Sequence, residues 1–199
     1  MKKNLWFVFS LLLFFPFSFA QEPVLAGSMV LVRCDNGKNE FLASPSDIDL
    51  SVLQQSFSSQ VDTIVMVHGF NTKPDGAKTT FEGTTALLKS HLGVRNYVGF
   101  YWPADMLIDF GKAVSNANES GRYLVHVLST VSKWYGSSGR SIHLMTHSLG
   151  GRVLLSTLLQ NEARYVKWGN CFNMAPAVHS DIYFASFSGT NLLPKKTWA

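Results

Sequence analysis

Cysteine is scarce in this chain, and its scarcity excludes two kinds of protein. Cys34 and Cys171 are the only cysteines among 199 residues, too few for the disulfide framework of a small secreted domain. These two residues and the six histidines also lack the ligand spacing of a metal site. We therefore expect no metal ion and no cofactor. The two thiols belong to an early and a late predicted strand, which lie far apart in the sheet argued for below, so we expect both to be buried and unpaired.

Charged residues are also few. Lys and Arg number 17 and Asp and Glu number 13. Because Lys2 and Lys3 belong to the N-terminal segment discussed next, 15 basic residues stand against 13 acidic ones in the rest of the chain. The chain lacks the basic stripe with interleaved aromatic residues that a nucleic-acid-binding surface requires. We expect no nucleic-acid partner.

The N-terminal segment carries an apolar run, Leu5–Phe15, directly after the two lysines. Pro16 breaks the run, and Ser-Phe-Ala at 18–20 fits a small-x-small cleavage site. This pattern predicts a signal peptide over residues 1–20 and export, to the periplasm or as a secreted protein. The run is shorter than the roughly 20 apolar residues of a membrane span. An uncleaved anchor is the alternative, and only then would we expect a membrane partner.

The rest of the chain, 21–199, alternates between strand and helix patterns, as in a single domain with a mostly parallel sheet and helices on both faces. Strands are predicted at 29–34, 64–67, 97–101, 141–145 and 168–174, with 40–43 as a hairpin partner of the first. Helices are predicted at 46–57, 74–93, 106–135 and 149–159. The longest helix shows a core stripe at Phe110, Val114, Ala117, Gly121, Leu124, Leu128, Val131 and Tyr135.

A sharp strand-to-helix turn is predicted at residues 146–150, Thr-His-Ser-Leu-Gly. A serine hydroxyl is a weak nucleophile and must be lifted out of the sheet towards a base. A tight turn achieves this, and the small residues Gly150 and Gly151 let strand and helix approach closely. The pattern predicts Ser148 as a nucleophile, with Thr146 at the place of the first glycine of G-x-S-x-G.

A second motif, His68-Gly69-Phe70, follows the buried strand pattern at 64–67. In serine hydrolases with such a turn, one backbone N–H of this early loop and the N–H after the nucleophile bind the oxyanion. Here those donors are Phe70 and Leu149, each worth about 3–4 kcal/mol when aligned. Gly69 would allow the close approach, and His68 would brace the loop. A strand that merely stops at a glycine turn is the alternative.

Three motifs together resemble a bacterial α/β-hydrolase family of poorly defined function. They are Val-His-Gly-Phe-Asn at 67–71, Phe-Tyr-Trp-Pro-Ala at 100–104 and Thr-His-Ser-Leu-Gly-Gly-Arg-Val-Leu-Leu at 146–155. The resemblance covers roughly residues 29–184 and implies an α/β-hydrolase-like three-layer sandwich. Two departures stand out: Ala177 occupies a position where the family tends to carry Asp, and the family's later segment with an acid and then a His is missing. We therefore expect a domain truncated at the C-terminus and lacking its last strands.

The missing segment leaves the acid and the base open. Such enzymes carry Ser, then Asp or Glu, then His in chain order. After Ser148 the chain offers one histidine, His179, and one aspartate, Asp181. Asp181 is the candidate acid, and His179 is a candidate base only if its loop folds back; otherwise it is a solvated loop residue. His147 adjoins the nucleophile, but neighbouring side chains at a strand end point to opposite faces, so we expect it to pack or to hydrogen-bond.

The sequence favours an esterase-, lipase- or thioesterase-like enzyme that acts on a small-molecule ester or other acyl substrate through an acyl-enzyme at Ser148. The alternative is a truncated relative that keeps the turn but lacks turnover, acting as a binding protein or as an inactive fragment. A third reading is a scaffold tethered to a membrane by the N-terminal apolar run.

Overall fold

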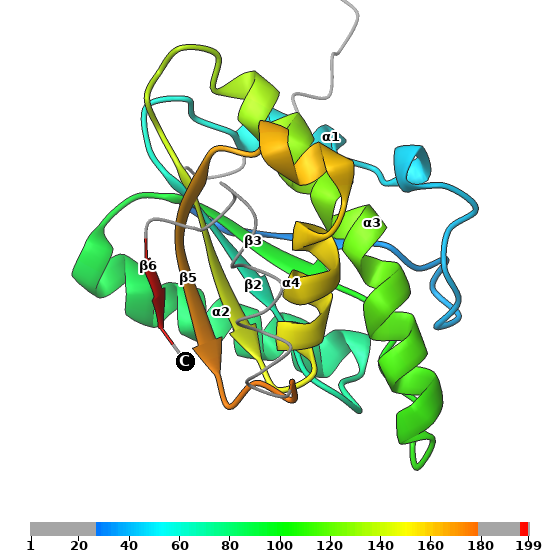
Figure 1. The fold of residues 1–199 in the computed structure, drawn as a ribbon. Coiled ribbons are helices and arrows are strands. Elements are labelled where there is room, and N and C mark those ends of the chain that lie inside the picture. The colour runs from blue at the N-terminus through cyan, green and yellow to red at the C-terminus, as the bar shows by residue number, and fades with distance from the viewer. Residues whose placement is uncertain (1–26, 179–195, 199) are drawn as a thin grey trace, which may run out of the picture.

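A computed structural model describes residues 27–178 and the short strand at 196–198. A six-stranded sheet in the order β1-β3-β2-β4-β5-β6 forms its centre (Figure 1), and every strand pair is parallel. The strands are β1 (Met29–Arg33), β2 (Thr63–Val67), β3 (Asn96–Tyr101), β4 (Ile142–His147), β5 (Trp168–Met174) and β6 (Lys196–Trp198). The predicted strand positions are therefore confirmed apart from the hairpin partner. The signal peptide predicted at 1–20 lies outside the described residues.

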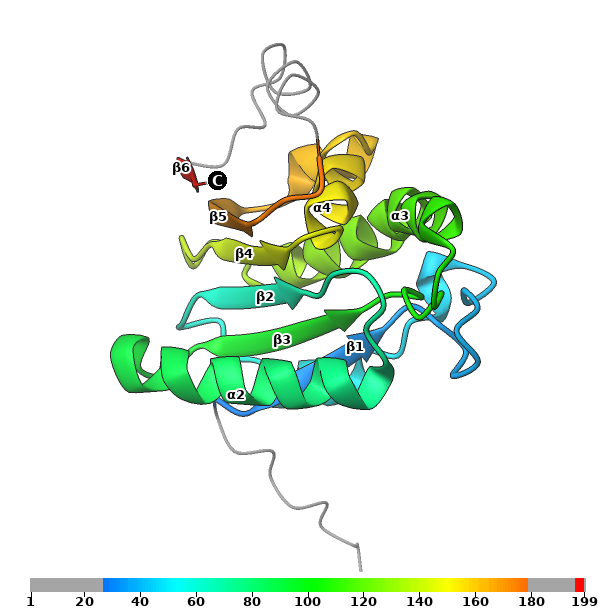
Figure 2. The same ribbon diagram turned by 90° about the horizontal axis from the view of Figure 1, so that it is seen from below.

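Helices cover both faces of the sheet, which gives three layers. Figure 1 shows α3 and α4 in front of the sheet and α2 behind it, and Figure 2 shows α2 alongside β3 and β1. The chain passes from β2 to β3 in one direction across the sheet and then returns in the other direction to β4 and β5. Because such crossovers are right-handed, α2 lies on one face of the sheet and α3 and α4 lie on the other. The helices are α1 (Ser51–Ser56), α2 (Pro74–Leu92), α3 (Phe110–Trp134) and α4 (Gly150–Leu158). Within the described residues, no helix is long and apolar enough to cross a bilayer.

Two predictions for the early part of the chain hold only in part. Residues 40–43 form no strand, because Phe41 makes only an isolated bridge with Asp35. The helix expected at 46–57 is divided into a short 3-10 helix, Pro45–Asp47, and α1. Side-chain caps explain the division, since Ser44 and Asp47 close a capping box around the first turn and Ile48 then becomes extended.

The long helix α3 begins four residues later than predicted. Asp109 caps it, with its Oδ1 accepting a hydrogen bond from the Lys112 N–H at 2.8 Å. Phe110, which was assigned to the core stripe, is therefore in the first turn and is 51% exposed. Val114 is partly buried, and the stripe positions from Ala117 onwards are buried as expected. Gly121 contacts α4 so closely that a Cβ atom on it would lie 2.6 Å from the Ser156 carbonyl carbon.

The two cysteines are buried and free, as predicted. Cys34 follows β1, while Cys171 lies in β5, and three strands separate these two strands in the sheet. Burial raises the pKa of both thiols, that of Cys171 to about 12. Both are therefore uncharged and unreactive at neutral pH.

Candidate active site

The carboxyl edge of the sheet concentrates backbone strain. β2, β3, β4 and β5 are each followed by a non-glycine residue with positive φ: Asn71 (53°), Leu107 (49°), Ser148 (51°) and Ala175 (45°). Each such residue costs about 1–2 kcal/mol in the left-handed region. Open parallel sheets bind ligands at this edge, and strained residues cluster at functional sites. The strain therefore directs attention to the loops around Ser148.

Ser148 and Leu149 turn the chain from β4 towards α4, and Ser148 is the one with positive φ. Its N–H donates to the Met174 carbonyl at 2.9 Å, and its carbonyl accepts from the N–H groups of Gly151 and Ala177, both at 3.0 Å. The end of β5 thus holds the turn on one side and the helix holds it on the other. The strand-turn-helix arrangement matches the sequence expectation, while the role of the hydroxyl as a nucleophile stays a prediction.

Two glycines bring the early loop against this turn. A Cβ atom on Gly69 would lie 3.0 Å from the Ser148 Cβ and 3.1 Å from the His147 Nδ1. A Cβ atom on Gly150 would lie 2.7 Å from the His68 carbonyl oxygen, closer than real Cβ atoms come. A Cβ atom does not fit at Gly150, and at Gly69 it would fit only if its neighbours moved by a few tenths of an ångström. The loop after β2 and the turn after β4 therefore meet backbone to backbone.

Two backbone N–H groups flank Ser148 and stay unpaired. Phe70 follows Gly69, Leu149 follows the serine, and in the described part of the chain neither N–H donates a hydrogen bond. Buried backbone donors are normally paired. Leu149 is fully buried and is the N-cap of α4, where the first N–H groups have no partner within the helix, so its N–H is free at the start of the helix. The two groups are available as donors to an anionic oxygen bound beside Ser148.

His68 is committed to bracing the early loop. Its Nε2 accepts from the Trp102 N–H at 3.2 Å, so its Nδ1 carries the proton and donates to the Gly69 carbonyl at 2.9 Å. The Trp102 indole N–H donates back to the His68 carbonyl, and the two rings stack 5.3 Å apart. Burial lowers the pKa of His68 to about 4. The imidazole is neutral at pH 7 and has no free nitrogen.

Thr146 occupies the place of the first glycine of the motif, and the structure explains why it fits. Its hydroxyl donates a hydrogen bond to the Asn173 side-chain carbonyl on the neighbouring strand β5, and both residues are buried. The pair links β4 to β5 just before the turn. The sequence analysis assigned no role to Asn173 or Trp102, because each contacts a residue on a neighbouring strand that is distant along the chain.

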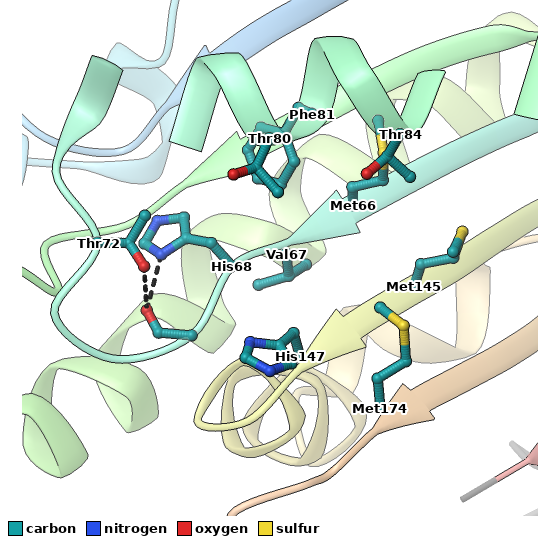
Figure 3. A pocket seen from close by; sticks show the side chains of 11 residues that line it. Met66, Val67, His68, Thr72, Thr80, Phe81, Thr84, Met145, His147 and Met174 are labelled. Carbon is teal, nitrogen blue, oxygen red and sulfur yellow. Dashed lines mark hydrogen bonds between the residues drawn. The ribbon is translucent and has the colours of Figure 1, made fainter. Parts of the chain in front are cut away.

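A pocket of about 420 Å³ opens beside the early loop on the α2 face of the sheet. Figure 3 shows His147, Met145 and Met174 on the strand side and Thr80 and Thr84 on the α2 side. The walls are mostly apolar, with methionines that adapt to ligands of varied shape. His147 is exposed and faces this pocket.

A comparison with protein-family models places this geometry in a known group. A family described as alpha/beta hydrolase of unknown function (DUF900) matches residues 49–195. The chain belongs to this family. No curated protein and no solved structure matches it. Membership agrees with the parallel sheet and the strand-turn-helix at Ser148, and it leaves the reaction of this α/β hydrolase open.

The acid and the base of the α/β hydrolase are not placed by the structure. His179 and Asp181 lie outside the described residues. Within residues 27–178, His68 and His147 are the histidines that border the turn, and neither has a carboxylate within ion-pair distance. Residues 27–178 also contain no cluster of His, Cys, Asp and Glu that could hold a metal.

Proposed function

We propose that this α/β hydrolase is a serine acyl hydrolase, acting on esters or thioesters through an acyl-enzyme at Ser148. The observation that carries the proposal is the strained turn at Ser148 between two unpaired backbone N–H groups. A left-handed serine costs stability, and so does a buried unpaired N–H. Catalysis at the Ser148 hydroxyl would explain why the fold tolerates both costs.

In the proposed reaction, the Ser148 Oγ attacks the acyl carbon and forms a tetrahedral intermediate. The Phe70 and Leu149 N–H groups donate to its oxyanion, and the alcohol or thiol leaves with a proton. Water then attacks the acyl-enzyme and releases the carboxylic acid. The pocket lined by Met66, Met145 and Met174 takes the apolar part of the substrate.

Ser148 requires a base to accept its hydroxyl proton, and the geometry excludes His68 from this role. His68 has both ring nitrogens engaged and a pKa of about 4, so it cannot accept this proton at neutral pH. We keep Asp181 as the candidate acid and His179 as the candidate base only because they follow Ser148 in the chain; His179 precedes Asp181, which reverses the usual order of acid and base.

A second function has its own support. No described histidine beside Ser148 has a carboxylate partner, and a triad without its base loses most of its rate. On this reading the protein binds an acyl ligand in the pocket without turning it over.

A fluorophosphonate probe separates the two functions, because it forms a covalent adduct only with an activated serine. The first proposal predicts labelling of the full chain, none of Ser148→Ala, and a rate in His179→Gln lower by about 10²–10⁴, the usual value of a general base. Absence of labelling in the wild type would favour the binding protein. Full labelling of His179→Gln would remove His179 from its role.

We also propose that the protein is exported, on the N-terminal pattern of two lysines, an apolar run and a small-x-small site. N-terminal sequencing of the protein expressed in its full length should find Gln21 as the first residue. An intact residue 1 on the membrane-bound protein would instead support the uncleaved anchor.

A further inference from the structure

The turn between β3 and α3 carries apolar side chains that contribute nothing to the core. Leu107 is 73% exposed and Ile108 is 96% exposed. They occupy the two central positions of a tight turn closed by a hydrogen bond from the Asp109 N–H to the Met106 carbonyl, at 2.8 Å. Such positions normally carry Gly, Asn, Asp or Pro, and Leu107 adopts its positive φ at a cost.

The turn is fastened at its base, so the exposed tip is built into the fold. The Asn39 side chain donates to the Asp105 carbonyl at 2.8 Å, and the Asn71 N–H donates to the Ala104 carbonyl at 2.9 Å. After the turn, Asp109 caps α3. Two exposed aliphatic side chains are therefore presented on a fixed support at the carboxyl edge, where Figure 1 shows the turn protruding below the start of α3.

The tip is continuous with the candidate active site. Phe110, directly after the turn, packs edge-to-face against Phe70 with ring centroids 5.4 Å apart. Phe70 carries one of the two free N–H groups, and its neighbour Gly69 contacts the Ser148 turn. The turn is thereby connected to Ser148 through Phe110, Phe70 and Gly69.

We propose that the turn Met106–Asp109 is a lipid-surface contact, which inserts Leu107 and Ile108 into an aggregate of acyl lipids and so presents ester substrate to Ser148. The size of the patch argues for lipid. A stable protein interface takes about 20–30 residues on each side, whereas the strength of shallow insertion into a lipid surface scales with the apolar area buried, so a few apolar side chains give a weak and reversible contact. The substrate class rests on the proposed function, while the lipid contact can be tested without it.

Site-specific labelling tests the contact in the full chain. An environment-sensitive thiol dye is attached to Ile108→Cys and, as a matched control, to Leu87→Cys, an exposed apolar position (62%) on α2. The native thiols are fully buried, and the unmodified chain serves as a labelling blank. With phosphatidylcholine vesicles we expect a blue shift at position 108 and none at 87. The comparison separates this contact from binding through the N-terminal apolar run, which would not bury position 108 selectively.

Other outcomes overturn the proposal. No shift at either position, or equal shifts at both, would show that the turn does not enter lipid. A shift at position 108 that grows with protein concentration in the absence of vesicles would assign the tip to a second copy of the chain.

A kinetic comparison tests the substrate class. Ile108→Ser should slow hydrolysis of a long-chain ester in vesicles by about tenfold or more and leave hydrolysis of a soluble acetate ester unchanged, with Leu87→Ser affecting neither. Equal losses on both substrates would contradict the lipid assignment. If neither ester is hydrolysed, the proposed function fails, and the dye comparison still decides whether lipid is bound.

Discussion

At the scale of single residues, the site depends on two glycines whose missing side chains allow close backbone contacts. Gly69 and Gly150 have no Cβ, and this lets the loop after β2 contact the Ser148 turn. His68 uses every polar atom of its ring to hold that loop against Trp102. The backbone of Ser148 is thus held by contacts on both sides.

Gly150→Ala should destabilise the protein, because its Cβ would lie 2.7 Å and 2.8 Å from two backbone oxygens that cannot move aside easily. We expect a loss of about 1–3 kcal/mol in unfolding free energy by urea denaturation, together with slower probe labelling. Gly83→Ala, in open space on α2, is the control and should be neutral or stabilising by up to about 1 kcal/mol. Equal effects of the two substitutions would mean that the close contact at Gly150 is wrong.

The stability of the fold should depend on pH through His68. Its pKa is about 4 in the folded state and about 6.5 when unfolded, so the unfolded chain binds the proton first as the pH falls. The contribution of His68 to the unfolding free energy is fully present above pH 6.5, and on the order of 3 kcal/mol of it is lost by pH 4. The unfolding free energy of His68→Gln, measured from pH 7 to pH 4, should lack this loss. Parallel curves for the variant and the wild type would show that His68 is not buried neutral.

At the scale of elements, the helices that cover the front of the sheet depend on a close crossing. Gly121 of α3 lies against Ser156 of α4, where a Cβ atom would come within 2.6 Å of the backbone. The Ser156 hydroxyl also donates to the Asn118 carbonyl across the two helices. Since α4 starts at Gly150, two residues after Ser148, this crossing fixes the direction in which the turn leaves the sheet.

Gly121→Ala should force the two helices apart and cost about 1–3 kcal/mol. Gly111→Ala, on the same helix with its nearest neighbour at an ordinary 3.6 Å, is the matched control. Thermal unfolding of both variants checks this. A Gly121→Ala protein as stable as Gly111→Ala would contradict the close crossing.

The sequence predicted the elements well where apolar periodicity decides them. The wholly buried β2 and the later stripe of α3 were readable, because burial on a fixed face repeats along the chain. The start of α3 could not be predicted from the sequence, because Leu107 and Ile108, which are exposed in the turn before Asp109, resemble a helical apolar pattern. The links from Trp102 to His68 and from Asn173 to Thr146 depend on the strand order β3-β2-β4-β5, which no local pattern encodes.

At the scale of the whole molecule, the two faces of the sheet are covered unequally. α3 and α4 cover the front of β4 and β5, whereas α2 lies along β3 and β1 on the other face. Phe172 and Met174 of β5 are left 38% and 47% exposed. Together with Met145 they border the pockets on that face.

This uncovered surface predicts self-association of the chain from residue 21 onwards, because contiguous exposed apolar patches promote it. Light scattering should show oligomers that grow with concentration, and Phe172→Ser should reduce them. Leu159→Ser, on an exposed apolar residue (64%) directly after α4, is the control and should not. A monodisperse monomer at high concentration would contradict the prediction.

The central claim is that the hydroxyl of Ser148 is an activated nucleophile. Peptide mapping by mass spectrometry after reaction with a fluorophosphonate tests it most directly, since the adduct marks the residue that reacted. We predict a single modified peptide with the adduct on Ser148 and none in Ser148→Ala. An adduct on another serine, or an unmodified wild-type chain under conditions that label a control serine hydrolase, would contradict the claim.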